Sequence, residues 1–569
     1  MGFLDNVLVS LDEGVTGLFG QWNTYTTALF TLFIGLITYQ VSVRRDPDTH
    51  PLLLARQAQA SPVRQPGESA VYRSQAAPHG MPLNAGLNIK DAGASKWSRG
   101  RDGDLRDIWR QAIAGVQDEG PTKGVTGRVM TVMGTELVTD HALDSITRQI
   151  NLIGQHILDQ GGNRVAIYLP NSVELIATLF ACAFYNMTAI ILPFDQPDDA
   201  VISMLRRSAA DTVVTVPGSF PFDVVVKNYP SLRQLVWVVD DGNSHMDWNE
   251  VPKGTGGSVN VATWQDVISD SPVDAGKELP PLEGQKEPRD VTVFWQSKPG
   301  TAEEMVRFTA ANLVSAVSAQ IFSIPTSQRI GPSDLFLPAD SLANTHTLVL
   351  TLGALYSNAS VAFNSVAVRA NDLAVATRGI APTILVATPE ALLKTHQESS
   401  SALSSIIARN LHWLQTRDLT QNGVMPAASL LNSYYDRLRP AIGAKPGKLR
   451  LIFTAERAGA GTPALSSAVI SDLRIYTRSR IIYALTAAKV AGAAAQTGYY
   501  DYRVFDDKQS HFGQPVTSAE IMLKDTPDYK TTDDLAQGEI FIKGLCVAGG
   551  EAGLGVVGTI RDDNTLAYV

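Results

Sequence analysis

The sequence has 569 residues, a net charge of −9 at pH 7 and a hydrophobic content of 44%. This length allows one large domain or several ordinary ones, with enough apolar residues for a sizeable core. The acidic balance argues against nucleic-acid binding, which needs a basic surface, and two cysteines in so long a chain exclude a disulfide framework.

The first expected element is an uncharged segment over residues 24–43 with an apolar centre. As a helix it would be roughly 30 Å long, the thickness of a bilayer core. Arg44 and Arg45 follow directly, whereas residues 1–23 contain no Lys or Arg. The positive-inside rule then predicts a single-pass transmembrane helix with the large C-terminal part in the cytosol, at the endoplasmic reticulum, a lipid droplet or a peroxisome. The alternative is a hydrophobic helix docked on the domain.

The next segment, residues 46–100, is rich in Pro, Gln, Ala, Ser and Gly, and this composition predicts an irregular linker. A helix over Leu105–Ala114 opens the globular part. The expected organisation is therefore an N-terminal segment over residues 1–45, a linker over 46–100 and one large domain over 101–569.

Helix and strand patterns alternate from residue 139 onward. An apolar stripe at helical spacing predicts a helix that Thr139 or Asp140 caps and that ends at Gly161. The apolar runs and breaks that follow predict a strand over 165–169, a helix over 173–185, a strand over 188–192, a helix over 197–209 and a strand over 212–216. Such alternation without tight hairpins predicts parallel strands with right-handed crossovers, an α/β fold.

A Gly, Pro, Asp and Ser rich stretch over 241–290 is expected to be a surface insertion. After it the patterns predict further helices and strands over 310–322, 348–355, 361–363, 383–387 and 449–453. Strands expected over 519–523 and 539–542 indicate a smaller β-rich part near the end of the sequence.

Five segments in this order resemble the AMP-forming acyl-CoA synthetases of the adenylate-forming superfamily. They are "GNRVAIYLPNSVE", "LFLPADSLANTHTL", "LRLIFTAERAGA", "RIIYALTAAKVAG" and "GEIFIKG" followed by "GTIRDDNTLAYV". Together the resemblance covers about residues 100–569. It implies the large N-terminal domain of those enzymes, with two αβ lobes and a distorted β-barrel. With the expected membrane helix it points to long-chain fatty acyl-CoA synthetases and fatty-acid transport proteins.

The resemblance implies a reaction that joins a carboxylate to the α-phosphate of ATP, so positive charge must surround the phosphates. The family's phosphate loop, "YTSGTTGKPKGV", aligns with residues 295–306, where only Ser297 and Val306 match. The second lysine of that loop becomes Glu304. A unit charge about 4 Å from another is worth roughly 4 kcal/mol near a surface, so an acid there repels a triphosphate. Lys298 and Thr301 would restore part of the attraction if the loop shifted by a residue or two.

Three more family motifs lack their functional groups. The "YGxTE" motif reads Tyr483-Ala484-Leu485-Thr486-Ala487, so the glutamate that holds magnesium is missing. The "TGD" motif ends in Val556, which cannot accept hydrogen bonds from ribose. The "LPLAH" motif has lost its histidine. The sequence ends 13 residues after Val556, before the family's C-terminal cap domain and its lysine, and we expect both to be absent.

These departures predict a catalytically inactive acyl-CoA synthetase-like protein, a pseudoenzyme that acts in lipid metabolism as an acyl-ligand binder, a scaffold or a regulator. No cofactor, metal or catalytic residue is expected. Its predicted partners are a membrane through the N-terminal helix and a long-chain acyl ligand or a protein, but no nucleic acid. The alternative is an active AMP-forming long-chain fatty acid–CoA ligase that uses ATP and Mg. Under that alternative the nucleotide would bind at Ser297, Thr301, Thr309, Tyr483 and Thr486.

Overall fold

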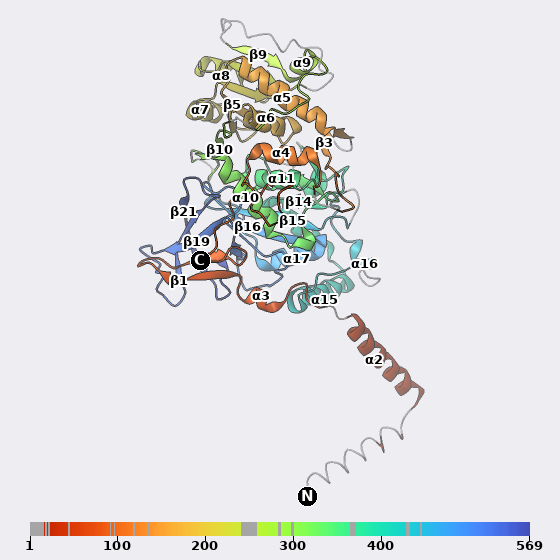
Figure 1. Cartoon of the computed structure of the whole chain (residues 1–569). Helices are drawn as coiled ribbons and strands as arrows, with labels where there is room; N and C mark the ends of the chain where they lie inside the picture. The colour runs from red at the N-terminus through yellow and green to blue at the C-terminus, as the bar shows by residue number, and fades with distance from the viewer. Residues whose placement is uncertain are drawn as a thin grey trace. The chain divides into compact units, whose positions relative to one another are not determined.

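The structure is a computed structural model of the chain, and it divides into two units, residues 1–48 and 49–569. It describes residues 16–17, 20, 23–43, 46–90, 93–95, 97–117, 120–133, 137–239, 259–282, 286–297, 301–364, 371–427, 433–443 and 447–569. Figure 1 shows the helices of both units and the three sheets of the second.

The first unit contains helix α2 (Thr24–Val43), at the bounds expected from the sequence. Asn23 caps it, because its side chain accepts hydrogen bonds from the backbone N–H groups of Tyr25 and Thr26. Among the described residues, no helix combines the length and the apolar character that crossing a membrane demands. The predicted transmembrane helix is therefore not supported. Polar residues, Thr24, Tyr25, Thr26 and Thr27, fill the first turn of α2.

The second unit begins its α/β part with a seven-stranded sheet in the order β11-β10-β6-β5-β7-β8-β9. Its strands are β5 (Arg164–Tyr168), β6 (Thr188–Ile191), β7 (Thr212–Thr215), β8 (Gln234–Trp237), β9 (Asn260–Thr263), β10 (Val291–Trp295) and β11 (Glu304–Phe308). All neighbouring strands are parallel except β10 and β11. The connecting helices are α5 (Leu143–Asp159), α6 (Val173–Phe184), α7 (Asp198–Ser208), α8 (Phe222–Asn228) and α9 (Trp264–Ser269). The predicted parallel α/β fold is confirmed here.

A nine-stranded sheet follows in the order β18-β17-β16-β15-β14-β12-β13-β3-β4. Its parallel strands are β3 (Val129–Met133), β12 (Leu335–Pro338), β13 (Ser360–Asn364), β14 (Ile384–Val386), β15 (Leu451–Arg457) and β16 (Arg480–Thr486). Three antiparallel edge strands complete it: β4 (Leu137–His141), β17 (Ala495–Gln496) and β18 (Gln514–Pro515). The helices of this region are α4 (Leu105–Ala114), α10 (Ala310–Ser323), α11 (Thr345–Tyr356), α13 (Leu373–Ala376), α14 (Pro389–Ala402), α15 (Ile406–Asn422), α16 (Ser433–Asp436) and α17 (Ser467–Thr477).

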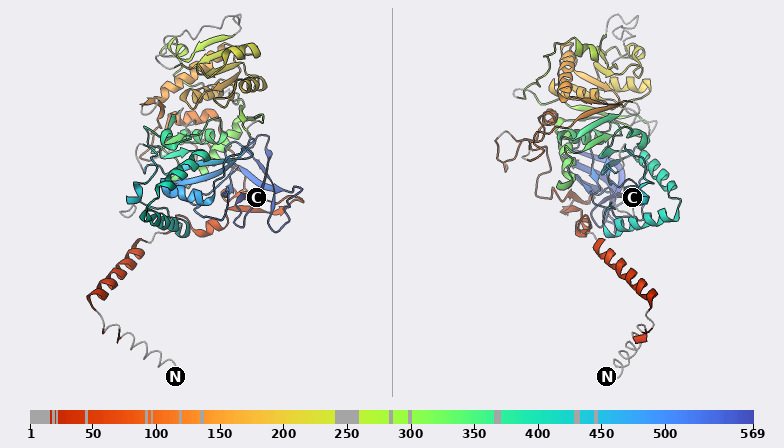
Figure 2. Two further views of the ribbon diagram at one scale, coloured as in Figure 1. Left: turned by 180° about the vertical axis from the view of Figure 1, so that it is seen from behind. Right: turned by 90° about the vertical axis from the view of Figure 1, so that its right-hand side faces the viewer.

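The third sheet is antiparallel and joins the two ends of the unit. Its order is β1-β2-β19-β20-β21-β22, with β1 (Ala58–Arg64), β2 (Ala70–Ser74), β19 (Ala519–Lys524), β20 (Gln537–Gly544), β21 (Glu551–Ile560) and β22 (Leu566–Tyr568). In the two turned views, the red N-terminal strands lie against the blue C-terminal ones (Figure 2). Residues 46–100 are therefore no simple irregular linker, because they contain helix α3 (Pro51–Ala55) and the hairpin β1–β2. Pairing with β19 satisfies the hairpin's backbone groups, a contact that local composition does not reveal.

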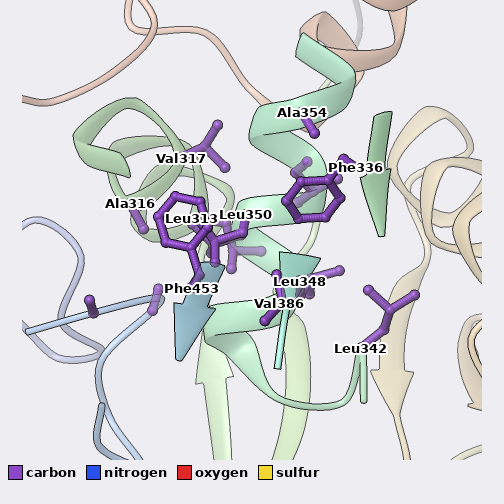
Figure 3. Packing of buried hydrophobic residues seen from close by; sticks show 14 of the residues in the cluster. Leu313, Ala316, Val317, Phe336, Leu342, Leu348, Leu350, Ala354, Val386 and Phe453 are labelled. Carbon is purple, nitrogen blue, oxygen red and sulfur yellow. The ribbon is translucent and has the colours of Figure 1, made fainter. Parts of the chain in front are cut away.

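The core lies between the sheets and the helices that pack on them. Figure 3 shows side chains of α10, α11 and strands β12, β14 and β15 in one cluster, among them Leu313, Leu350, Phe336, Val386 and Phe453. All five are almost completely buried. This apolar layer fixes the ends of β14 and β15, where the candidate site lies.

Local signals explain most helix ends. Ser172 caps α6 by accepting a hydrogen bond from the Leu175 N–H at 3.2 Å. The predicted cap of α5 is wrong, because Thr139 and Asp140 belong to strand β4 and the residue before the helix is Ala142. The predicted surface insertion over 241–290 contains strand β9 and helix α9, which buries Trp264, so it is not simply a surface insertion. Residues 241–258 and 283–285 of this stretch lie outside the described residues.

Candidate functional site

A cavity of about 140 Å³ lies at the carboxyl ends of the parallel strands of the nine-stranded sheet. In open α/β sheets this edge is the usual place for ligands. Its walls come from the end of β10, the turn after β12, the first turns of α11 and α14, and the ends of β15 and β16. They are formed by Trp295, Asp340, Asn344, Thr345, His346, Val386, Ala387, Thr388, Pro389, Glu390, Ala455, Arg457, Ala460, Gly461, Thr462 and Thr486.

Arg457 is the central cation of this cavity. Its guanidinium carbon lies 4.6 Å from the centre of the Trp295 ring, a cation–π contact. One terminal nitrogen donates a hydrogen bond to the Gln296 carbonyl oxygen at 3.2 Å, and Nε is buried with no partner among the described residues. Burial lowers the pKa of Arg457, while Asp340 and Glu390 oppose that shift. The guanidinium keeps its charge, so the cavity has a cation whose hydrogen-bonding capacity is not used up.

His346 is a second polar group of the cavity with an unused atom. The side chain is 4% exposed and sits in the first turn of α11. Its Nε2 atom has no partner in the described part of the chain. Burial lowers the pKa of His346 to about 4, so the imidazole is neutral at pH 7.

The Asp340 carboxylate, by contrast, already accepts hydrogen bonds from neighbouring side chains. Its carboxylate accepts hydrogen bonds from the Asn344 amide at 2.8 and 2.9 Å and from the Thr347 hydroxyl at 2.8 Å. This acid therefore fixes the turn between β12 and α11. It also faces Arg457 without a direct salt bridge.

Glu456 and Tyr483 occupy the neighbouring strands β15 and β16, one layer behind the cavity. The Tyr483 hydroxyl donates to a Glu456 carboxylate oxygen at 3.4 Å and accepts from the Gln509 amide at 3.1 Å. Burial raises the pKa of Glu456 to about 7, although the hydrogen bonds from Tyr483 and Gln509 act against it. The Tyr483 ring is completely buried and packs at 5.4 Å against Phe512, so it does not line the cavity.

The loop expected to hold phosphates lies between β10 and β11, where residues 298–300 fall outside the described residues. Ser297 precedes them and is partly buried, and Thr301 follows them and is exposed. The two acids after the loop have cationic neighbours: Glu303 lies 3.7 Å from Arg207, and Glu304 lies 3.9 Å from Lys489. Arg207 and Lys489 thus balance the negative charges of these two acids.

The remaining predicted site residues, Thr309 and Thr486, belong to different elements. Thr309 caps α10, where its side chain and Asn312 form a reciprocal capping box. Thr486 lines the cavity, and its hydroxyl donates to the Glu456 carbonyl oxygen at 2.9 Å. Ala487 is buried in the core, and Val556 on β21 packs against it. Their roles in nucleotide binding stay predictions.

The described residues of this edge do not fit a magnesium-bound triphosphate. Arg457 lies against Trp295 in the cavity wall, and Ala487 offers no carboxylate to hold the metal. The cavity is close to the roughly 150 Å³ of an engineered cavity that binds benzene, and below the roughly 300–1,000 Å³ of pockets for drug-sized ligands. A compact ligand matches its size, and Arg457 is the cation of its lining, beside the acids Asp340 and Glu390.

Comparison with known proteins agrees with this fold. The model of the AMP-binding enzyme family matches residues 146–293. Among solved structures, the anthranilate CoA ligase AuaEII is 16% identical, with a TM-score of 0.56 over 82% of this chain and 76% of that one. A benzoate CoA ligase from Burkholderia xenovorans is 12% identical, with a TM-score of 0.53 over 82% of this chain and 79% of that one. The fold is therefore that of the adenylate-forming acyl- and aryl-CoA ligases.

A relative in Saccharomyces cerevisiae has a higher sequence identity over most of both chains. It is the uncharacterized protein YHR045W, 21% identical over 523 residues, which cover 88% of this chain and 86% of that protein. This similarity spans both α/β lobes and carries no information about a reaction.

Sequence reasoning missed the groups that define the cavity. Arg457 lies in "LRLIFTAERAGA", but its charge within a segment where the family has "GGAPL" was a signal that could have been used. No sequence signal singles out His346, which is buried and also lines the cavity because α11 begins at the same sheet edge.

Proposed function

We propose that this protein is a catalytically inactive relative of the acyl-CoA ligases that binds a small carboxylate and acts as a binder or regulator in lipid metabolism. The observation that carries the proposal is the guanidinium of Arg457, which stands in the cavity against Trp295 with Nε unpaired among the described residues. An arginine fork is the side chain best suited to bind a carboxylate with two parallel hydrogen bonds.

The walls support a compact acyl or aromatic group behind that carboxylate. Val386, Ala387 and Ala455 supply apolar surface, and the cavity of about 140 Å³ is close to the roughly 150 Å³ that hold benzene in an engineered cavity. A sixteen-carbon chain is far larger, which favours a short or aromatic acid over the long-chain ligand expected from the sequence. The anthranilate and benzoate ligases among the similar structures are named for acids of this size.

The absence of catalysis is proposed on separate grounds. Ala487 and Val556 offer no ligand to magnesium or ribose, and Glu303 and Glu304 lie in the segment that aligns with the family's phosphate loop. The working-ligase alternative is tested by ATP–pyrophosphate exchange with benzoate, octanoate and palmitate. We expect exchange at background level, and turnover above it would overturn the proposed inactivity.

Carboxylate binding is tested by titrating the full chain with benzoate and following tryptophan fluorescence. A carboxylate that draws Arg457 away from the Trp295 ring changes the emission of that indole. We expect a saturable change that Arg457→Gln abolishes and Trp295→Phe removes. Arg233→Gln, an exposed arginine in the other α/β lobe, is the matched control and should titrate like the unchanged protein. Equal titration of Arg457→Gln and the unchanged protein would contradict the proposal.

A further inference from the structure

Helix α15 exposes a row of large apolar side chains that the cavity does not use. Ile406, Ile407, Trp413 and Leu414 are 71%, 64%, 59% and 46% exposed. In a helix of 3.6 residues per turn these positions fall on one broad face. Single exposed apolar residues are common, whereas four on one face, with a tryptophan among them, mark an interaction surface.

The opposite face of α15 holds the helix firmly in place. Ala408, Gln415 and Leu419 are buried, and His412 bonds in two directions. Its Nε2 lies 3.0 Å from an oxygen of Asp472 on α17, and its Nδ1 lies 2.8 Å from the Tyr435 hydroxyl. The exposed row therefore has a fixed direction, pointing away from the domain.

Charge distinguishes this row from the rest of an acidic protein. Arg409 and Arg417 flank it, both exposed, and the Arg417 guanidinium lies 5.9 Å from the Trp413 ring. Asp418 is the acid of α15, and it lies at the edge of the row. The helix therefore differs from the chain as a whole, which carries a net charge of −9. Apolar side chains bordered by arginines match a surface that is apolar within and anionic at its rim.

A second, smaller group of the same kind lies at the same end of the larger unit. In helix α3, Leu52 and Leu53 are 74% and 67% exposed, and the exposed Arg56 follows the helix. All three views place α3 and α15 at this end (Figures 1 and 2). The two groups are thus separate apolar clusters at one end of the unit, each with an exposed arginine next to it.

We propose that α15, with α3 beside it, docks on the surface of an anionic lipid bilayer. Tryptophan and aliphatic side chains enter the boundary between head groups and acyl chains, and arginines bind the head groups. This contact is peripheral and uses the large domain itself, so it is independent of the N-terminal helix and of the ligand in the cavity. It would bring the carboxylate site close to a source of acyl compounds.

The two cysteines of the chain make a position-specific test possible, because Cys182 and Cys546 are both buried. The full chain with Ile407→Cys is labelled with an environment-sensitive dye and mixed with vesicles. One set is pure phosphatidylcholine and the other contains a third of phosphatidylserine. The matched control carries the label at Val273→Cys, an aliphatic position in the other lobe that is 80% exposed. We expect a blue shift and a several-fold rise in emission at position 407 with the anionic vesicles, and none at position 273.

Other outcomes would overturn the proposal. If the protein sediments with vesicles while the label at 407 does not change, the N-terminal segment binds the membrane and α15 does not. A change at 407 that needs no lipid and grows with protein concentration would assign the surface to a second copy of the chain. The variant Arg409→Glu/Arg417→Glu, unlabelled and full length, should lose at least tenfold in affinity for anionic vesicles. Unchanged affinity in a folded variant would contradict the role of these arginines.

Discussion

The two parallel sheets of the larger unit have the same alternation of strands and helices but bury different chemistry. In the seven-stranded sheet, the buried side chains on β5 and on the helix that packs against it are apolar, such as Ile167 and Phe180. At the carboxyl edge of the nine-stranded sheet, the buried groups include His346 and Glu456, and a third ionisable group, Asp501, is buried after strand β17. The difference teaches that this fold tolerates costly ionisable groups at one edge, because the apolar layers elsewhere supply most of the stability.

The largest effect is expected when a buried aromatic side chain is truncated next to the seven-stranded sheet. Phe180 is fully buried, and its ring lies 5.3 Å from that of Trp109. Phe180→Ala should lower the free energy of unfolding in urea by about 3–5 kcal/mol, through lost burial and the cavity left behind. Phe322→Ala, at a half-exposed position on α10, serves as the control and should cost far less. A decrease of less than about 1 kcal/mol in the free energy of unfolding of Phe180→Ala would show that this apolar layer does not supply most of the stability.

Replacing Glu456 in the nine-stranded sheet should stabilise the protein, in contrast to Phe180→Ala. Its folded-state pKa of about 7 lies above the ordinary 4.5. The folded protein then binds the proton more tightly, so the contribution to stability is full below pH 4.5 and is lost as the pH rises through 7. Glu456→Gln should therefore raise the free energy of unfolding at pH 8 by about 2–3 kcal/mol, and the gain should shrink toward pH 4. A pH-independent difference would show that Glu456 is not buried as an acid.

Asp501 sharpens the comparison, because this buried acid has its partners. Burial alone would raise its pKa, but Arg503, His511 and Gln57 outweigh that effect and lower the pKa to about 2. The stabilisation is present above the ordinary value of 3.8 and is lost as the pH falls through 2.

The corresponding variant should lose stability where Glu456→Gln gains it. Asp501→Asn should cost about 2 kcal/mol at pH 7, measured by urea unfolding. It should also loosen the N-terminal strands, since Gln57 donates to Asp501 at 2.6 Å. Asp528→Asn, an exposed acid, is the control. Equal stability of Asp501→Asn and the unchanged protein would show that the arginine partner of Asp501 does not distinguish it energetically from Glu456.

The smallest effect is expected at Arg457. A partly buried cation with an unused nitrogen contributes little net stability, because desolvation offsets its contacts. Arg457→Met should change the free energy of unfolding by less than about 1 kcal/mol while abolishing the fluorescence response to benzoate. A large loss of stability would mean that Arg457 has a structural role rather than a ligand-binding one.

The sequence predicted the fold well where its signals are local. The helix over Leu105–Ala114 has the predicted bounds, because Asp104 caps it and Gly115 ends it. The strands of the seven-stranded sheet were recognisable as short apolar runs between breaks. The hairpin β1–β2 could not be predicted, because its stability depends on strand β19, more than 440 residues away.

The candidate site was predicted mainly by what it lacks. Glu304, Ala487 and Val556 stand out only against a family pattern. The groups that are present come from separate segments, and only the parallel register of β14, β15 and β16 brings Thr388, Arg457 and Thr486 to one edge. No periodicity in the sequence carries that information.

Calorimetric titration of the full chain with Mg-ATP tests the central claim most directly, since the claim is that this edge of the fold no longer accepts a triphosphate. The account predicts no saturable heat at millimolar nucleotide, while benzoate binds in the same preparation. Saturable, magnesium-dependent binding of ATP that weakens in Thr486→Val would contradict it.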